Sequence, residues 1–213
     1  MTLPSILCVE PDSEARALFK ELLSGFQPSF ARNAYDALRE LSNGAFDAYV
    51  LELWLPDFSG LALCREIHRT DPRGPVVFCT AAARVQDEGR AMKAGAHAYL
   101  RKPLDPPQLL ESLRVLIASS QARSARASEA AERAVVLEIE RYRAEILKRT
   151  PAGREEAFHA LQKLMKPRIY LAYAQLGGVR ASFDRGWTAM YRRAWSSFEE
   201  LSGVAASAAE QPS

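Results

Sequence analysis

The sequence contains few residues able to form disulfides or bind transition metals, with three cysteines and three histidines among 213 residues. An odd number of cysteines at unrelated spacings excludes a disulfide scaffold and predicts reduced, buried thiols. No cysteine or histidine has a second ligand at a metal-binding spacing, and neither a glycine-rich phosphate loop nor a Ser/His/Asp pattern occurs. We therefore expect no metal site, no cofactor and no enzymatic activity.

Long hydrophobic runs are also missing. No apolar stretch approaches the roughly 18 residues that can span a bilayer. The N-terminus has no basic segment followed by an apolar stretch and a cleavage site. With 48% hydrophobic and 25% charged residues, the composition is that of an ordinary globular protein. We expect a cytoplasmic protein that has no contact with membranes.

Charge of one sign does not dominate the chain, but it is divided unevenly along it. Residues 1–120 carry 13 Lys and Arg against 15 Asp and Glu, and residues 121–213 carry 15 against 11. The length suits one domain with an appendage, and the change of sign suggests two parts with different partners. We predict a first domain over residues 1–120, a helical region over 121–203 and a disordered tail over 204–213.

The first 120 residues alternate short apolar runs with amphipathic stretches. The runs predict five strands and the stretches five helices, which together indicate an α/β fold with a parallel sheet covered on both faces. In such sheets the functional groups lie beyond the carboxyl ends of the strands. The polar side chains expected at those ends are Glu10, Asp12, Glu52, Thr80 and Lys102.

Four segments of this half resemble the receiver domain of bacterial response regulators. They are ILCVEPD at 6–12, DAYVLELWLPDFSG at 47–60, VVFCTA at 76–81 and AGAHAYLRKP at 94–103. Their order and spacing match the family, and the resemblance extends over residues 3–118. It implies a flavodoxin-like (βα)5 fold with strand order 2-1-3-4-5.

The resemblance also implies a phosphorylation site. In this family an aspartate at the end of the third strand accepts a phosphoryl group from a histidine kinase, and two acidic residues after the first strand hold Mg²⁺. A hydroxyl residue after the fourth strand and a lysine after the fifth contact the phosphoryl oxygens, while an aromatic residue in the fifth strand reports the state by changing rotamer. Thr80, Lys102 and Tyr99 match these last three positions.

The two positions that carry the chemistry depart from the family pattern. Glu52 stands at the acceptor position, and Pro11 stands where a metal-binding carboxylate belongs, with Asp12 one residue late. A proline offers no side-chain oxygen to Mg²⁺, and the extra methylene of Glu52 displaces its carboxylate by more than ~1 Å. We expect neither phosphorylation nor tight Mg²⁺ binding. Asp57, the nearest substitute acceptor, is expected to point away from Lys102.

Glu52 has two possible roles. Its carboxylate can reach Lys102 and Thr80, where it would supply part of the charge of a phosphoryl group and hold one signalling conformation. Alternatively, the pocket is vestigial and Glu52 forms only a structural ion pair. Trp54, beside the mouth of the pocket, could hinder a kinase, contact a partner or simply pack.

The second half of the chain reads as helical. Residues 118–134 lack large apolar side chains but are rich in Ala and Arg, which favours a continuous exposed helix over a flexible linker. Further helices are predicted over 135–146 and from Pro151 to 166. Pro167 is expected to interrupt the pattern, with a short helix over 168–176 and a last helix that Ser182 or Asp184 can cap.

The last helix carries an aromatic stripe formed by Trp187, Tyr191 and Trp195. Helical spacing places the stripe on one face, which is typical of a helix–helix contact and less typical of a base-stacking platform. Across residues 163–193, seven basic side chains, among them Arg192 and Arg193, occur with a single acid, Asp184. Such a cluster can bind nucleic acid or an acidic protein, or can be a solvated face.

Together these features predict a non-catalytic signalling adaptor. Its first domain would dock a protein partner near Tyr99 and Lys102, on the surface formed by the fourth helix, fifth strand and fifth helix. Its helical region would form a homodimer or bind a second protein. The main alternative is a transcription regulator whose basic C-terminal region binds DNA, and a third is a phosphorylated regulator with an unusual site.

Overall fold

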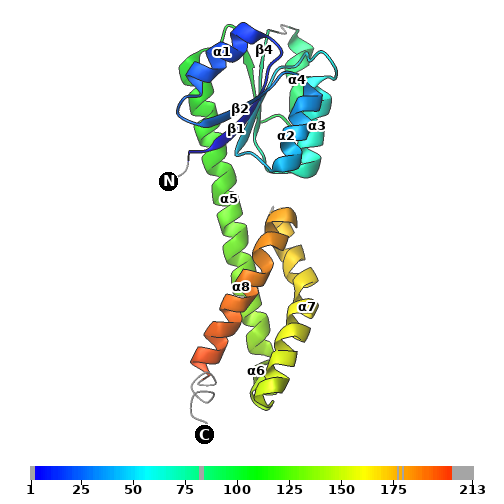
Figure 1. The fold of residues 1–213 in the computed structure, drawn as a ribbon, viewed down its shortest axis with the longest axis vertical. Helices are drawn as coiled ribbons and strands as arrows, with labels where there is room; N and C mark the ends of the chain where they lie inside the picture. Colours follow the sequence, from blue (N-terminus) through cyan, green and yellow to red (C-terminus); the bar gives the residue numbers. More distant parts are fainter. Residues whose placement is uncertain (1–2, 82–83, 177, 179, 203–213) are drawn as a thin grey trace. The chain divides into compact units, whose positions relative to one another are not determined.

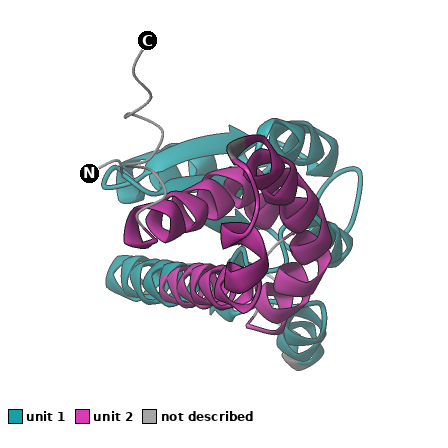
Figure 2. Ribbon diagram, turned by 90° about the horizontal axis from the view of Figure 1, so that it is seen from below, with its two compact units in different colours: residues 1–121 teal, residues 122–213 magenta. Residues whose placement is uncertain are grey.

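A computed structural model describes residues 3–81, 84–176, 178 and 180–202. The chain forms two compact units, residues 1–121 (the N-terminal unit) and residues 122–213 (the C-terminal unit), which Figure 2 colours separately. The predicted tail, residues 204–213, lies outside the described residues. Within the described ranges, no helix has the length and apolar character needed to cross a membrane.

The N-terminal unit is built on a five-stranded parallel sheet. Its strands are β1 (Ser5–Val9), β2 (Gln27–Ala31), β3 (Ala48–Leu51), β4 (Val76–Thr80) and β5 (Ala98–Arg101). They lie in the order β2-β1-β3-β4-β5, which confirms the predicted topology. Strands β3 and β4 are buried along their whole length, as expected for near-continuous apolar strands covered on both faces.

Helices cover both faces of this sheet (Figure 1). They are α1 (Ser13–Leu22), α2 (Ala34–Asn43), α3 (Gly60–Thr70), α4 (Val85–Lys93) and α5 (Pro106–Arg141). On one face, Phe19 of α1 and Leu109 and Leu113 of α5 pack against β1, β3 and β4. On the other face, α2, α3 and α4 pack against alternate residues of the same strands. The period-two alternation of the strands therefore supplies two separate apolar cores.

Helix ends in this unit follow local sequence signals. The Asn33 side chain accepts a hydrogen bond from the Asp36 N–H at 2.8 Å and caps α2. Gly95 follows the last residues of α4 with φ +107°, a conformation that side chains other than glycine rarely adopt. These signals set where the chain turns back toward the sheet.

Helix α5 continues without a break through residues 118–134, which confirms the prediction of a continuous helix there. Buried Ala127, Ala131, Val135 and Ile139 follow at intervals of four residues, and they belong to the core of the C-terminal unit. Small side chains in the first part of this stretch explain why it lacks an obvious apolar pattern in the sequence.

The C-terminal unit adds α6 (Arg143–Leu147), α7 (Pro151–Gln175) and α8 (Arg180–Leu201). The predicted interruption at Pro167 was wrong, because α7 runs through it to Gln175. Met165 and Ile169 on either side of the proline are buried in the core. Their packing offsets the roughly 3 kcal/mol that an interior proline costs a helix.

The start of the last helix also differs from the prediction. Helix α8 begins at Arg180, so neither Ser182 nor Asp184 is its N-cap. Asp184 instead forms ion pairs with Lys166 Nζ at 2.8 Å and with Arg180 Nε at 2.9 Å. The acid thus joins α7 to α8.

Candidate functional site

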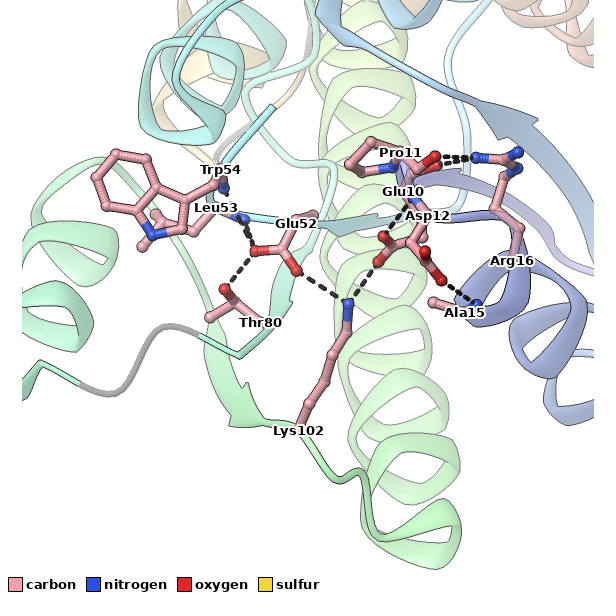
Figure 3. A network of polar contacts seen from close by, with 10 residues as sticks. All are labelled: Glu10, Pro11, Asp12, Ala15, Arg16, Glu52, Leu53, Trp54, Thr80 and Lys102. Carbon is pink, nitrogen blue, oxygen red and sulfur yellow. Dashed lines mark hydrogen bonds and ion pairs between the residues drawn. The ribbon is translucent and has the colours of Figure 1, made fainter. Parts of the chain in front are cut away.

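Four polar side chains from different strand ends meet at the carboxyl edge of the sheet (Figure 3). Glu10 follows β1, Glu52 follows β3, Thr80 ends β4 and Lys102 follows β5. Parallel pairing brings these ends together, since all five strands point the same way. The sequence placed all four at this edge, and the structure joins them in one network of contacts.

The Glu52 carboxylate is the centre of this network. One oxygen, Oε1, accepts hydrogen bonds from the backbone N–H of Leu53 at 2.7 Å, from that of Trp54 at 3.3 Å and from the Thr80 hydroxyl. The other, Oε2, lies 2.9 Å from Lys102 Nζ. Only 8% of Glu52 is exposed, and its hydrogen-bonded partners offset the cost of burying the charge. The expected reach of Glu52 to Lys102 and Thr80 is therefore present.

Backbone packing fixes the segment that carries Glu52. The Gly60 N–H donates to the Leu53 carbonyl at 2.9 Å at the start of α3. A Cβ atom at position 60 would collide with the backbone carbonyl oxygen of Glu52. Glycine therefore permits the close approach of α3 to the strand end that positions the carboxylate.

Lys102 lies between two carboxylates. Its Nζ is 2.6 Å from Glu10 Oε2 as well as 2.9 Å from Glu52 Oε2. Burial alone lowers the pKa of Lys102, but the hydrogen bonds and negative charges of Glu10 and Glu52 outweigh burial and raise it above the ordinary value. The ammonium therefore stays charged and holds the two acids together.

A second cation supports the β1 end of the site, and the sequence analysis missed it. Arg16 donates from one guanidinium nitrogen to the backbone carbonyls of Glu10 at 2.8 Å and Pro11 at 2.6 Å. The Glu10 side chain also accepts from the Asp12 N–H at 3.0 Å. A basic residue one turn into the helix that follows the Glu10-Pro11 pair was the available sequence signal.

Asp12 was expected in the acidic pocket but has a different role. Its Oδ1 caps α1 by accepting from the Ala15 N–H at 2.8 Å, and the residue is exposed. Pro11 contributes no side-chain oxygen, and Lys102 Nζ binds the Oε2 atoms of both Glu10 and Glu52. Mg²⁺ requires near-octahedral oxygen ligation, so these residues do not fit the two-acid magnesium site that the resemblance implies.

Asp57, the substitute acceptor considered from the sequence, caps α2. Its two oxygens accept from the Ala34 N–H at 3.0 Å and the Tyr35 N–H at 2.9 Å. What little burial Asp57 has favours the neutral form, but the backbone hydrogen bonds outweigh it and lower the pKa of Asp57. The carboxylate joins the loop after β3 to α2, and it forms no described contact with Lys102.

Tyr99 and Trp54 are the two aromatic residues predicted at the pocket. Tyr99 in β5 is half-buried, with its ring 6.4 Å from that of Phe78. Burial and then the negative charge of Asp87 raise the pKa of Tyr99. Trp54 is 58% exposed, and its backbone N–H donates to Glu52, so the indole is largely open to solvent at the edge of the site.

The predicted aromatic stripe of α8 lies in the core of the C-terminal unit. Trp187, Tyr191 and Trp195 are each at most 5% exposed. Their rings contact one another in series, and the Tyr191 hydroxyl donates to the Phe158 carbonyl at 3.2 Å. Burial raises the pKa of Tyr191. The stripe is a helix–helix contact, so these rings are unavailable as a base-stacking platform.

The basic cluster of this unit is largely paired with acids, several from other helices. Arg168 lies 3.4 Å from Glu138, Arg193 lies 3.1 Å from Glu132, and Lys166 and Arg180 share Asp184. These pairs link α5 with α7, α5 with α8, and α7 with α8. The sequence count of seven bases against one acid missed Glu132 and Glu138, which are distant in the chain.

Known proteins resemble the N-terminal unit. The model of the response regulator receiver domain family matches residues 6–114. Protein PetR of Rhodobacter capsulatus is 33% identical over 116 residues, covering 54% of this chain and 48% of PetR. Response regulator MprA of Mycobacterium sp. strain KMS is 32% identical over 114 residues, covering 53% and 50%. The chain thus spans about half the length of these curated relatives.

Solved structures agree with this result. The CheY-like receiver domain protein from Methanospirillum hungatei JF-1 aligns with a TM-score of 0.54 and 27% identity, covering 57% of this chain and 98% of that one. The matching part contains the parallel sheet and the site at its carboxyl edge. The family match covers half of the sequence, and the strand order agrees with it, so the chain belongs to the response regulator receiver domain family.

Proposed function

We propose that this protein is a non-enzymatic, cytoplasmic signalling adaptor whose N-terminal unit holds one signalling conformation without being phosphorylated. The observation that carries the proposal is the position of the Glu52 carboxylate, which contacts both Thr80 and Lys102. In the family, these two residue types contact the oxygens of the phosphoryl group. Glu52 therefore makes within the chain the contacts that a phosphoryl group would make.

Charge supports this role. A phosphoryl group brings about −1.5 to −2 charges and three acceptor oxygens. Glu52 alone brings one charge and two oxygens, but Glu10 adds a second carboxylate oxygen at 2.6 Å from Lys102. The ammonium thus has two anionic partners, which approach the charge that a phosphoryl group would place beside it. A merely structural ion pair is the competing interpretation.

The same contacts oppose the family's reaction. Glu52 Oε1 accepts from three donors and Oε2 is paired with Lys102, which lowers the nucleophilicity of both oxygens toward a phosphorus centre. Pro11 offers no side-chain oxygen and Asp12 caps α1, so the loop after β1 supplies Glu10 without the second acid of the family's Mg²⁺ pair. We expect no phosphoryl adduct after incubation with acetyl phosphate and Mg²⁺, measured as intact mass. A stoichiometric adduct on Glu52 or Asp57 would overturn the proposal.

A second experiment separates a phosphoryl substitute from a structural pair. Glu52→Gln keeps the shape of the side chain but removes its charge. If Glu52 holds the signalling conformation, this variant changes the environment of Tyr99, followed by NMR of fluorinated tyrosine. Asp57→Asn is the matched control, since Asp57 forms no described contact with the network. An unchanged Tyr99 signal in Glu52→Gln would show that Glu52 is only structural.

The proposed docking surface of the N-terminal unit is formed by α4, β5 and α5. Met92 of α4 and Val115 of α5 are 48% and 52% exposed, and Tyr99 of β5 is half-buried. Exposed apolar side chains are typical of protein contact surfaces. A partner bound here would sense the position of Tyr99, which lies three residues before Lys102 in the sequence.

For the C-terminal unit we propose protein–protein contact rather than DNA recognition. Four of the seven basic residues of the cluster lie in ion pairs, which leaves fewer charges for phosphates. If the three remaining basic residues each neutralise one phosphate, nonspecific DNA binding should fall by about 40-fold between 50 and 200 mM salt. Tight binding to one DNA sequence at physiological salt would support the transcription-regulator alternative, while Arg192→Glu with Arg193→Glu should weaken an acidic protein partner.

A further inference from the structure

Helix α7 carries a stripe of exposed apolar residues that faces away from the core of its own unit. Leu164 and Leu171 are 54% and 63% exposed, and Ala160 and Pro167 are also exposed. The four positions follow one another at intervals of four, three and four residues. This is the spacing of the two apolar positions of a heptad, which form a continuous seam along one side of a helix. The residues of α7 that belong to the core are a different set and recur at every fourth position, from Ala157 to Tyr173.

A hollow lies beside one end of this seam. It has a volume of about 460 Å³ and is lined by residues of α6, of α7 and of the links on either side of α6. Ala157, Ala160 and Leu161 form its α7 side, and Tyr142 and Ile146 face them. The seam therefore has projecting leucines at Leu164 and Leu171 and a recess next to Ala160. A surface with both a projection and a recess can pair with an inverted copy of itself.

We infer that α7 pairs in antiparallel orientation with α7 of a second copy of this chain. A two-fold axis makes such a contact self-complementary, because each pair of facing residues occurs twice. The inference deepens the proposed association through the C-terminal helices and does not depend on the role of Glu52. It names the surface and the orientation of the two chains.

Side-chain size fits this arrangement. In an antiparallel heptad pair, the two kinds of seam position face each other across the axis. Leu171 then faces Ala160 of the second copy and enters the hollow beside it, while Leu164 faces Pro167 of the second copy. Each leucine meets a smaller or flatter residue, as knobs-into-holes packing requires. No leucine is left opposite another leucine.

Charge selects the antiparallel orientation over the parallel one. Lys163 and Arg168 flank the seam on opposite sides. A parallel pair would place Lys163 of each chain beside Arg168 of the other, and facing like charges destabilise helix pairs. The antiparallel pair places Lys163 near Tyr170 of the second copy and Arg168 near Leu161 of the second copy. Neither contact repels, and Arg168 keeps its ion pair with Glu138.

The size of the contact sets its expected strength. A single helix pair buries less than the about 800 Å² per partner that is typical of stable complexes. The dimer should therefore be reversible, with an apparent mass that rises with concentration in sedimentation velocity of the full chain. Leu171→Asp should reduce association at least tenfold and leave the helical content unchanged, since its side chain is exposed.

Leu137→Asp is the matched control. Leu137 lies on α5 in the same unit and is 70% exposed, but it is outside the seam. This variant should associate as the natural chain does. A natural chain that stays monomeric at all concentrations would overturn the inference, and so would equal loss of association in Leu137→Asp and Leu171→Asp.

Cysteine cross-linking tests the orientation directly. In the double variant Ala160→Cys with Leu171→Cys, each thiol should face the other kind in the second copy and form an intermolecular disulfide. The two sites are about 16 Å apart along one helix at 1.5 Å per residue, so they cannot bridge within a chain. Neither single variant should cross-link. Equal cross-linking by the single variants would indicate a parallel pair and overturn the proposed geometry.

Discussion

The two units differ in where their polar side chains lie, buried in one and exposed in the other. Every buried polar or charged residue in the described part of the chain lies in the N-terminal unit, and these are Glu10, Glu52, Arg73, Thr80 and Asp87. Three of them meet at the carboxyl edge of the sheet. The core of the C-terminal unit consists of apolar and aromatic side chains, while its ion pairs lie on partly or largely exposed side chains.

This difference separates two kinds of task. Burying charge costs free energy unless the group is paired and hydrogen-bonded, so a buried polar network marks a position where the structure depends on one arrangement of charges. An apolar helical core stabilises a scaffold and leaves its outer faces available for association. The N-terminal unit is thus suited to hold a conformational state, and the C-terminal unit to bring chains together.

The largest expected change in stability comes from comparing one tryptophan in each unit. Trp187→Ala should lower the free energy of unfolding of the C-terminal unit by about 4 kcal/mol, because a buried indole leaves a cavity. Trp54→Ala should change the stability of the N-terminal unit by no more than about 0.5 kcal/mol, since the indole is 58% exposed. Thermal unfolding followed by NMR signals of each unit tests both. Equal losses of stability in the two variants would contradict the buried position of Trp187 and the exposed position of Trp54.

The next effect concerns the charge network. Lys102→Met should cost about 3 kcal/mol, at the lower end for a broken buried ion pair because the Lys102 side chain is 22% exposed. The pKa of Lys102 is raised in the folded state, so its stabilisation is complete below the ordinary value of about 10.4 and disappears as pH rises through the raised value. Urea unfolding at neutral and strongly alkaline pH measures this.

A variant in which all three charged side chains of the network are replaced by neutral ones is the control for that experiment. Lys102→Met combined with Glu10→Gln and Glu52→Gln removes the unpaired carboxylates as well as the ammonium. It should recover part of the stability that Lys102→Met loses. A stability difference between the natural chain and Lys102→Met that does not shrink at alkaline pH would contradict the role of the ammonium.

A smaller effect tests whether the departures from the family are confined to two residues. Pro11→Asp with Glu52→Asp should cost about 1–2 kcal/mol through the lost hydrogen bonds of Glu52. In return, it should gain a response of Trp54 fluorescence to Mg²⁺, since the backbone N–H of Trp54 donates to the side chain at position 52. Glu52→Asp alone should gain a weaker response. A folded double variant that ignores Mg²⁺ would show that other residues also prevent binding.

The smallest effect compares two helix caps. Asp57 caps α2 in the N-terminal unit, and the Thr150 side chain caps α7 in the C-terminal unit by accepting from the Gly153 N–H at 3.2 Å. Replacing either by Ala should cost about 1 kcal/mol. Only the Asp57 contribution should depend on pH. Because the pKa of Asp57 is lowered, its stabilisation is present above the ordinary value of about 3.9 and lost as pH falls through the lowered value.

The fold of the N-terminal unit could be predicted because its signals are local. Continuous apolar runs predicted the strands, amphipathic stretches predicted the helices, and the resemblance predicted the strand order. Glu52, Thr80 and Lys102 could be placed at one edge because parallel strands end together. Their mutual contacts could also be predicted, because side chains at the same edge of the sheet are long enough to reach one another.

What the sequence did not predict depends on pairs that are distant in the chain. Nothing around Asp57 indicates that it caps a helix 23 residues earlier. The pairing of Arg168 with Glu138 requires knowing that α5 and α7 are neighbours. Pro167 carries a strong local helix-breaking signal, and the buried residues on both sides of it outweighed that signal. In each case tertiary packing decided the outcome.

The three cysteines have a consequence for reactivity. All are free and buried, and all belong to the N-terminal unit: Cys8 in β1, Cys64 in α3 and Cys79 in β4. Burial raises the pKa of each thiol, that of Cys64 to about 11. Little thiolate exists at neutral pH, so alkylating reagents and oxidants should react only when the sheet or α3 opens. The rate of alkylation of the natural chain therefore reports opening of the N-terminal unit alone, and it needs no introduced label.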